Sequence, residues 1–192
     1  MVPSPEIENH PFPPFCPPGA KVLIMGTFPP GRHRWAMDFY YPNRTNDFWK
    51  IMGLIFLNDV NALYNPATGQ YDLPAIIELM TARGIALNDT ARQVRRLRGN
   101  ASDKFLEIVT PVPLDQLLAQ MPECRAVVTT GEKAASVVAA LTDTEPPKMG
   151  EMVTGPDGLH IWRMPSTSRA YPMKIEKKAE MYRRLFSFEK IL

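Results

Sequence analysis

Two loops in this chain carry the residue types that a binding or catalytic site requires. The first is GTFPPG, from Gly26 to Gly31, and the second is MPSTSRAYP, from Met164 to Pro172. Hydroxyl groups and backbone amides, such as those of the Ser-Thr-Ser run in the second loop, can donate hydrogen bonds to phosphate. Each loop follows a short apolar run, so each is expected at the carboxyl end of a buried strand. Open α/β sheets place their active sites at that edge.

A third segment with polar and aromatic side chains, YYPNRTNDFW, lies between the two loops. Asn46 stands at the start of a helical pattern, where a side-chain oxygen can cap the first backbone amides. A capping oxygen leaves the side-chain NH₂ group free for a second role. Phe48 and Trp49 fall inside the amphipathic pattern and are expected in the core. Tyr40 and Tyr41 precede the helix and can face a pocket.

The elements that must position these segments alternate between strands and helices. Strands are expected at 21–25, 85–90, 124–130 and 160–164, and helices at 46–56, 73–84, 103–111, 113–122, 132–142 and 174–192. Such alternation predicts a mainly parallel sheet covered on both faces. We expect a proline-rich N-terminal arm at 1–19 and a single α/β domain at 20–192, with Phe12 and Phe15 of the arm packed against the domain.

Composition limits the class of protein. The chain has 192 residues, a formal net charge of +2 and two cysteines, Cys16 and Cys124. The cysteines are far apart and fit no metal-ligand spacing, so neither a disulfide framework nor an iron–sulfur cluster is expected. No apolar run reaches the roughly twenty residues of a membrane span, and the first residues do not read as a signal peptide. We therefore expect a cytoplasmic protein.

The three motifs LIMGTFPPG, YYPNRTNDFW and MPSTS together resemble the uracil-DNA glycosylase superfamily. The resemblance is greatest to its hypoxanthine-DNA glycosylase and mismatch-specific uracil/thymine glycosylase branches, and it extends from Lys21 to about Ala170. It implies a three-layer α/β/α sandwich with a central, mainly parallel four-stranded sheet. It also implies a monofunctional enzyme of base-excision repair, which hydrolyses the N-glycosidic bond of hypoxanthine or uracil flipped out of DNA. No cofactor or metal is expected, and the protein is expected to be a monomer that binds DNA containing a damaged base.

The resemblance also assigns roles to individual residues. The base-binding pocket is expected to comprise Gly26, Thr27, Phe28, Pro29, Tyr40, Tyr41 and Asn88, and the DNA-binding loop Pro165, Ser166, Thr167, Ser168 and Arg169. Many relatives have an Asp or Asn at the position of Phe28 and a His at that of Met164. Because both polar residues are missing here, Asn46 is the predicted catalytic residue, which positions the attacking water or the base.

Two of these assignments have a plain structural alternative. Asn88 takes the place of an amide that reads the base edge in relatives, because an amide offers both a donor and an acceptor. Asn88 and Asp89 can equally form an ordinary turn after a strand. Asn46 can likewise be a helix cap and nothing more.

Basic residues gather in two stretches of the sequence. They are Arg92, Arg95, Arg96 and Arg98, and then Lys174, Lys177, Lys178, Arg183 and Arg184. Such clusters commonly form a solvated face, but beside the two loops they would form a track for DNA phosphates.

Two other functions fit the same motifs. A superfamily member that has lost the chemistry would bind nucleic acid or a nucleobase-like ligand, and the substitutions at Phe28 and Met164 favour that alternative. An unrelated nucleotide-binding α/β protein is disfavoured, because GTFPPG has neither the GxxxxGK[ST] nor the GxGxxG spacing that holds phosphates.

Overall fold

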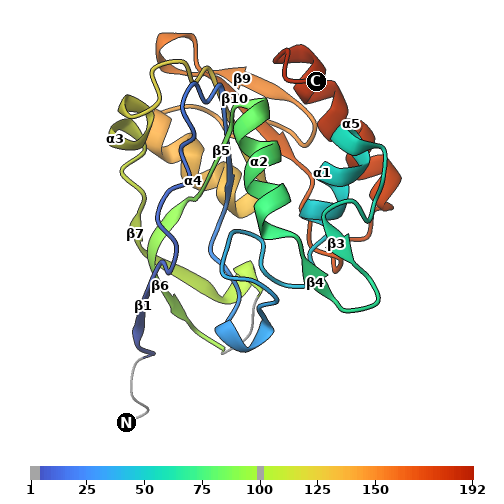
Figure 1. Cartoon of the computed structure of the whole chain (residues 1–192). Coiled ribbons are helices and arrows are strands. Elements are labelled where there is room, and N and C mark those ends of the chain that lie inside the picture. The colour runs from blue at the N-terminus through green and yellow to red at the C-terminus, as the bar shows by residue number, and fades with distance from the viewer. Residues whose placement is uncertain (1–4, 99–101) are drawn as a thin grey trace.

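A five-stranded sheet forms the centre of the molecule (Figure 1). The computed structural model describes residues 5–98 and 102–192. The strand order is β5 (Ile85–Asp89), β2 (Val22–Gly26), β8 (Ala126–Thr130), β10 (His160–Met164) and β9 (Met152–Thr154). The first four strands are parallel, and β9 pairs antiparallel with β10. The predicted α/β/α sandwich is confirmed, and its four parallel strands carry a fifth, antiparallel edge strand that the sequence did not reveal.

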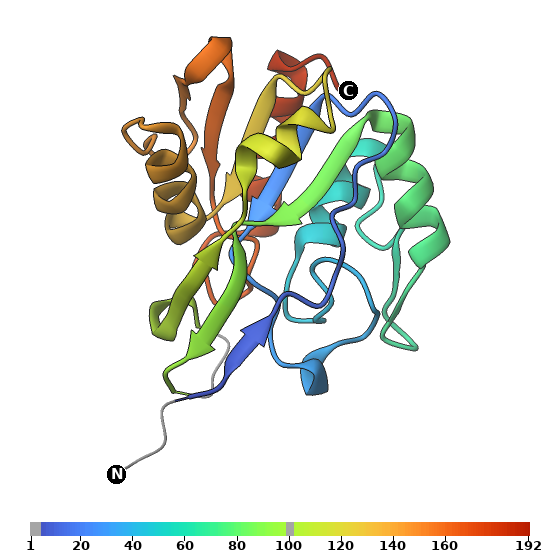
Figure 2. The same cartoon turned by 90° about the vertical axis from the view of Figure 1, so that its left-hand side faces the viewer.

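Helices cover both faces of this sheet, which explains the continuous apolar runs of its strands. Every residue of β2 is buried. Val22 and Ile24 contact one core, which includes residues of α1 (Phe48–Leu57), α2 (Leu73–Arg83) and α5 (Ile175–Phe188). Leu23 and Met25 point the opposite way, into a core with residues of α3 (Leu114–Ala119) and α4 (Glu132–Thr142). Figure 2 shows α4 on one side of the sheet and α1 and α2 on the other.

The ends of α2 follow the signals in its sequence. The Asp72 carboxylate accepts a hydrogen bond from the Ala75 amide (3.1 Å), Pro74 lies in the first turn, and Gly84 ends the helix with a left-handed φ of 65°. A side-chain acceptor satisfies one of the free amides at a helix start, and glycine adopts a positive φ without strain. The predicted start and end of this helix are therefore confirmed.

The helix predicted at 103–111 is wrong. Asp103–Phe105 forms one 3₁₀ turn, and β7 (Leu106–Pro111) follows. β7 pairs antiparallel with β6 (Ala91–Arg96), which pairs with β1 (Ile7–Asn9) in a second, three-stranded sheet. The LEIVTP segment includes β-branched residues that suit a strand, and its pairing with β6 decided its structure.

The N-terminal arm packs against the domain. Besides the pairing of β1 with β6, Phe15 forms a two-way backbone bridge with Leu87 of β5, both hydrogen bonds being 2.9 Å. Phe12 and Phe15 pack against the larger core, as expected. Residues 1–4 of the predicted arm, and 99–101 after the basic stretch, lie outside the described residues.

The remaining elements are short. They are the 3₁₀ turns η1 (Arg32–Arg34) and η3 (Pro156–Gly158), and the hairpin of β3 (Tyr64–Asn65) and β4 (Gln70–Tyr71). Within residues 5–98 and 102–192, no helix combines the length and apolar character needed to cross a bilayer.

Candidate active site

A cavity of about 910 Å³ opens at the carboxyl edge of the parallel strands. The two predicted loops meet there, together with the segment that precedes α1 and two carboxylates from the β5 to β7 region. Its walls comprise residues 26–30, Arg34, 41–43, Thr45, Asn46, Asp89, Ser102, Asp103, Thr130 and 166–172. The sequence-based prediction of a site at this edge is therefore matched by a cavity in the structure.

Backbone hydrogen bonds hold the second loop against the start of α1. Asn46 forms a β-bridge with Ser168. The Asp47 amide donates to the Thr167 carbonyl (2.8 Å), and the Arg169 amide donates to the Thr45 carbonyl (2.9 Å). These bonds connect residues at least 120 positions apart and form one continuous wall of the cavity.

Asn46 lies on this wall with one end of its side chain engaged. Its Oδ1 accepts a hydrogen bond from the Phe48 amide (2.9 Å), although the N-cap position of α1 is the next residue, Asp47, which has no side-chain cap bond. No hydrogen bond within the described part of the chain involves its Nδ2. Asn46 therefore stabilises the helix start and still presents an NH₂ donor to the cavity.

The predicted aromatic wall is formed by Phe28 and Tyr41. The Tyr41 ring lies parallel to Phe48, with centroids 3.9 Å apart, and its hydroxyl lies 3.2 Å from the Thr130 hydroxyl. The backbone of Tyr41 has a φ of 52°, a left-handed conformation that is uncommon for a bulky residue and often marks a functional site. Burial raises the pKa of the Tyr41 hydroxyl far above its ordinary value.

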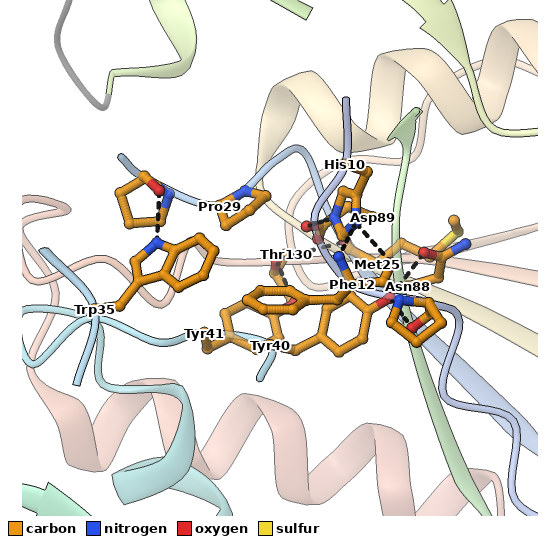
Figure 3. A network of polar contacts seen from close by, with 12 residues as sticks. His10, Phe12, Met25, Pro29, Trp35, Tyr40, Tyr41, Asn88, Asp89 and Thr130 are labelled. Atoms are coloured by element: carbon orange, nitrogen blue, oxygen red, sulfur yellow. Dashed lines mark hydrogen bonds and ion pairs between the residues drawn. The ribbon is translucent and has the colours of Figure 1, made fainter. Parts of the chain in front are cut away.

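Tyr40 and Asn88 do not line the cavity, unlike the predicted arrangement. The Tyr40 side chain is buried, and its single hydroxyl proton is shared between two acceptors, the Pro13 carbonyl (2.9 Å) and Asn88 Oδ1 (3.0 Å) (Figure 3). The reason lies in the alternation of side chains along β5: Asn88 points to one face of the strand and Asp89 to the other. The side chain that reaches the cavity from the end of β5 is a carboxylate and not the expected amide.

Pro165 and Met164 also lie away from the cavity. Met164 is 1% exposed and belongs to the larger core. Pro165 is buried, and its carbonyl accepts a hydrogen bond from the Tyr182 hydroxyl (3.0 Å). The part of the second loop that can reach a ligand begins at Ser166.

Asp89 is a site residue that the sequence-based assignment missed. Its carboxylate is 92% shielded from solvent, and Oδ2 lies 2.8 Å from Nε2 of His10. A Cβ atom on Gly26 would lie only 2.9 Å from Asp89 Oδ1, so a glycine is needed where the two strand ends meet. The register of β2 and β5 pairs Gly26 with Asp89. Strand alternation was the only signal in the sequence, and nothing in it linked His10 to this place.

Asp103 supplies a second carboxylate to the cavity. Desolvation raises the pKa of Asp103 above its ordinary value, although the Thr27 hydroxyl, which donates to Oδ2 (3.0 Å), and the Lys133 ammonium oppose that rise. The nearby Asp89 charge adds to it. Asp103 lies on the segment predicted as a helix, which is why its place in the site was missed.

Several of the predicted DNA-contacting cations are used inside the fold. Lys178 is 1% exposed and donates to the Ser168 carbonyl (2.9 Å), and burial lowers its pKa. Arg96 donates hydrogen bonds to the Glu8 carboxylate of the arm (2.9 Å) and to the Pro29 carbonyl (2.7 Å). Arg169 is half-exposed and pairs with Asp47 (2.9 Å) at the cavity rim. Lys178 and Arg96 thus fix the two loops instead of forming a free surface.

The fold and the position of the cavity agree with the comparisons with known proteins. A family model described as the uracil DNA glycosylase superfamily matches residues 13–187. This chain belongs to that superfamily. Among solved structures, the solution NMR structure of a putative uracil DNA glycosylase from Methanosarcina acetivorans has a TM-score of 0.67 and 18% sequence identity, and the match covers 96% of this chain and 99% of that chain. No curated protein matches the chain.

The superfamily assignment from the three motifs is thus confirmed, while the resemblance to particular branches stays a prediction. At 18% identity the NMR structure shows a shared fold and no more. Among the described residues, no group of three or more His, Cys, Asp or Glu side chains is arranged to hold a metal ion.

Proposed function

We propose that this chain is a monofunctional DNA glycosylase that removes a deaminated base, hypoxanthine or uracil, from DNA. The observation that carries the proposal is the composition of the cavity wall. An aromatic surface, the free amide of Asn46 and the shielded carboxylate of Asp89 meet at the sheet edge where the superfamily motifs lie. Its volume of about 910 Å³ falls in the range of small-molecule sites and has room for a flipped nucleotide.

The chemistry requires an attacking water and stabilisation of the departing base. A water oxygen forms a bond to C1′ of the deoxyribose while the C1′–N bond breaks and its electron pair leaves with the base. Asp89 Oδ1 is the carboxylate oxygen available to orient this water and accept its proton, and a proton from solvent later neutralises the base. Because an Asp89 carboxylate is negative, it also stabilises the positive charge that develops on the sugar.

Asn46 is the proposed second participant. Its Nδ2–H₂ group donates, so it can hold the water or a carbonyl oxygen of the base, whose negative charge grows as the bond breaks. Phe28 and Tyr41 provide aromatic surface for the extruded base. Ser166, Ser168 and the rim cation Arg169 are the proposed contacts to backbone phosphates, whereas Thr167 is 1% exposed and holds the loop through its carbonyl.

The edge of a deaminated base suits acceptor groups in this wall. Uracil and hypoxanthine each present a ring N–H where cytosine and adenine have a lone pair, so an oxygen acceptor favours the deaminated forms. Asp103 is the carboxylate of the cavity that can accept such a bond, because Asp89 is assigned to the water. The specific base stays part of the proposal.

Oligonucleotide cleavage tests the proposed function directly. Duplexes and single strands carrying uracil, hypoxanthine, xanthine or a mismatched thymine are incubated with the protein and then treated with alkali, which cuts at abasic sites. We expect cleavage of the uracil or hypoxanthine strands by the wild type and a large loss in Asn46→Ala and Asp89→Asn. Sedimentation of the same preparation checks the expected monomer.

One alternative has a specific observation in its favour. Phe28 and Met164 stand where many relatives have polar groups, so a chain that binds nucleic acid or a nucleobase-like ligand without cleaving it fits the same cavity. Binding of uracil-containing DNA, strongest at low salt, with no alkali-labile site on any substrate would support this alternative.

A further inference from the structure

The N-terminal arm reaches the candidate active site through one side chain, His10. His10 directly follows β1, and its backbone amide donates to the Arg92 carbonyl (2.9 Å), so strand pairing fixes its place. Prolines at positions 11, 13 and 14 restrict the chain that follows. The arm is therefore stiff on both sides of the imidazole that meets Asp89, 79 residues away in sequence.

Aromatic rings hold the imidazole in a single orientation. Tyr40 stacks on it with centroids 5.7 Å apart, and Phe28 meets it edge-on at 5.2 Å. The side chain is 8% exposed. Figure 3 shows His10 beside Asp89, with Tyr40 and Phe12 close by. A side chain confined in this way cannot turn its ring nitrogen away from the carboxylate without unpacking its neighbours.

The contacts of the other ring nitrogen agree with a donor role for Nε2 toward the Asp89 carboxylate. Nδ1 lies 3.2 Å from the Phe12 amide nitrogen and 3.0 Å from the Phe12 carbonyl oxygen. If Nδ1 accepts from the amide, the neutral ring carries its proton on Nε2; if Nδ1 donates to the carbonyl, the ring is protonated on both nitrogens. In both cases Nε2–H donates to Asp89 Oδ2, because an ionised carboxylate can only accept.

This contact leaves the two carboxylate oxygens of Asp89 in different states. Oδ2 is engaged by His10, whereas Oδ1 has no hydrogen bond within residues 5–98 and 102–192 and lies next to Gly26 at the cavity. Engagement of one oxygen fixes the plane of the carboxylate, so the direction of the free oxygen is fixed as well.

We propose that His10 is a positioning residue, which holds the Asp89 carboxylate so that Oδ1 points at the attacking water. The inference rests on the proposed function. It makes the arm a working part of the site in a chain whose Phe28 cannot supply the polar group found in many relatives. His10 itself touches neither the water nor the base; its effect passes through Asp89.

A set of five variants tests this role under single-turnover conditions, with DNA affinity measured separately on an uncleavable substrate analogue. We expect His10→Ala to lower the rate of base release by about 10- to 100-fold, as loss of an outer supporting partner does, with DNA affinity changed by less than about threefold. His10→Gln keeps an N–H donor near the position of Nε2 and should recover most of the rate. Phe15→Leu, which loosens arm packing without touching the pair, is the matched control and should keep the wild-type rate.

A double variant tests whether His10 and Asp89 act jointly or independently. His10→Ala combined with Asp89→Asn should be no slower than Asp89→Asn alone, because residues that act as a unit are not additive. If the double variant is slower by the product of the two separate rate losses, the proposal is overturned. A His10→Gln rate as low as that of His10→Ala, or a loss of DNA affinity that accounts for the whole effect, would also overturn it.

An NMR measurement tests the contact between His10 and Asp89 independently of the proposed function. A wild type that cleaves no substrate defeats the proposed function, and the imidazole proton of His10 then decides the positioning alone. A slowly exchanging Nε2–H signal that is present in the wild type and lost in Asp89→Ala supports it. The absence of that signal from the wild type overturns it.

Discussion

Two histidine–carboxylate pairs lie at opposite ends of the parallel strands, and they are nearly identical in length. His10 Nε2 lies 2.8 Å from Asp89 Oδ2 at the carboxyl edge, and His160 Nδ1 lies 2.7 Å from Glu189 Oε1 at the amino edge. The two edges lie at opposite ends of the molecule, with the C-terminus near one and β1 of the arm near the other (Figure 1). The pairs differ in what surrounds the carboxylate.

At the amino edge, the Glu189 carboxylate is enclosed by protein. Glu189 is 1% exposed, and its Oε1 also accepts from Trp162 Nε1 (2.8 Å), while Oε2 faces Arg125 at 3.4 Å. Arg125 donates in addition to the Glu189 backbone carbonyl. These contacts connect the residue after α5 to the starts of β8 and β10. Glu189 Oε2 is buried without a hydrogen bond among the described residues, and the Arg125 charge is its ion-pair partner. None of these residues lines the candidate active-site cavity, so we assign the pair a structural role.

The carboxyl-edge pair is open on one side. One oxygen of Asp89 is engaged by His10, and the other lies at a cavity of about 910 Å³. Each carboxylate has one oxygen without a hydrogen bond among the described residues, so what sets Asp89 apart is that it lines the cavity, where a ligand can reach it. A histidine–carboxylate pair thus stabilises the fold at the amino edge, whereas at the carboxyl edge it is available for chemistry.

The largest predicted effect is on the rate of base release in Asp89→Asn. The amide keeps the shape of the carboxylate but cannot accept the proton of water, so we expect a loss of about 10²- to 10⁴-fold, the usual contribution of a general base. The free energy of unfolding should stay within about 1 kcal/mol of the wild type. Rapid-quench measurement with uracil or hypoxanthine DNA checks the rate. An unchanged rate would remove the distinction between the two pairs.

Glu189→Ala should give the converse result. Removal of this buried carboxylate leaves His160, Trp162 Nε1 and Arg125 without their partner, and breaking a buried pair costs about 3–5 kcal/mol. Urea unfolding monitored by circular dichroism measures the loss, and the rate of base release per folded molecule should not change. A loss of rate without a loss of stability would show that the amino edge also takes part in the reaction.

Asn46→Ala tests the second proposed participant at the carboxyl edge. The variant removes the free Nδ2 donor as well as the bond from the Phe48 amide, so we expect a rate loss of about 100-fold, as for a lost transition-state donor. Loss of this hydrogen bond at the helix start should also cost about 1 kcal/mol of stability. Asn46→Ser, which keeps a capping oxygen, is the control: it should restore stability but not rate. Full activity of Asn46→Ala on every substrate would show that Asn46 is only a cap.

The smallest predicted effect concerns Asp103, the other carboxylate of the open edge. Partial desolvation raises the pKa of Asp103, so the folded state favours its protonated form, and the ionised form costs stability as pH rises through the folded-state pKa. Because the residue as a whole is exposed, solvent screens its charge, and Asp103→Asn should raise Tm at neutral pH by less than about 1 °C. The gain should vanish in acid, where wild-type Asp103 is protonated in both states. A variant that melts lower than the wild type at pH 7 would contradict this sign.

Local patterns predicted the parallel sheet because each of its strands is a buried apolar run next to a helical pattern. The same patterns predicted both loops, the ends of α2 and the place of Asn46. They failed for 103–111, where pairing with β6 overrides the helical reading of a short segment. They also failed where the site depends on contacts between distant segments, as with His10 and Asp89.

That Asp89 and not Asn88 lines the cavity has a simple physical reason. Both residues end β5, and strand geometry sends them to opposite faces. Which face holds the cavity depends on Tyr40, whose hydroxyl binds Asn88, and on the arm, whose His10 binds Asp89. Neither partner is near β5 in sequence, so residue type alone favoured the amide.

Direct detection of the released base is the most direct test of whether the protein is a glycosylase. Wild type and the double variant Asn46→Ala/Asp89→Asn are incubated with excess uracil- and hypoxanthine-containing DNA, and free base and abasic sites are quantified together by mass spectrometry. We predict that the wild type releases one base for each abasic site formed, over several turnovers, and that the double variant releases almost none while still binding the DNA. Bound DNA with no free base from the wild type on either substrate would contradict the account and assign the cavity to binding alone.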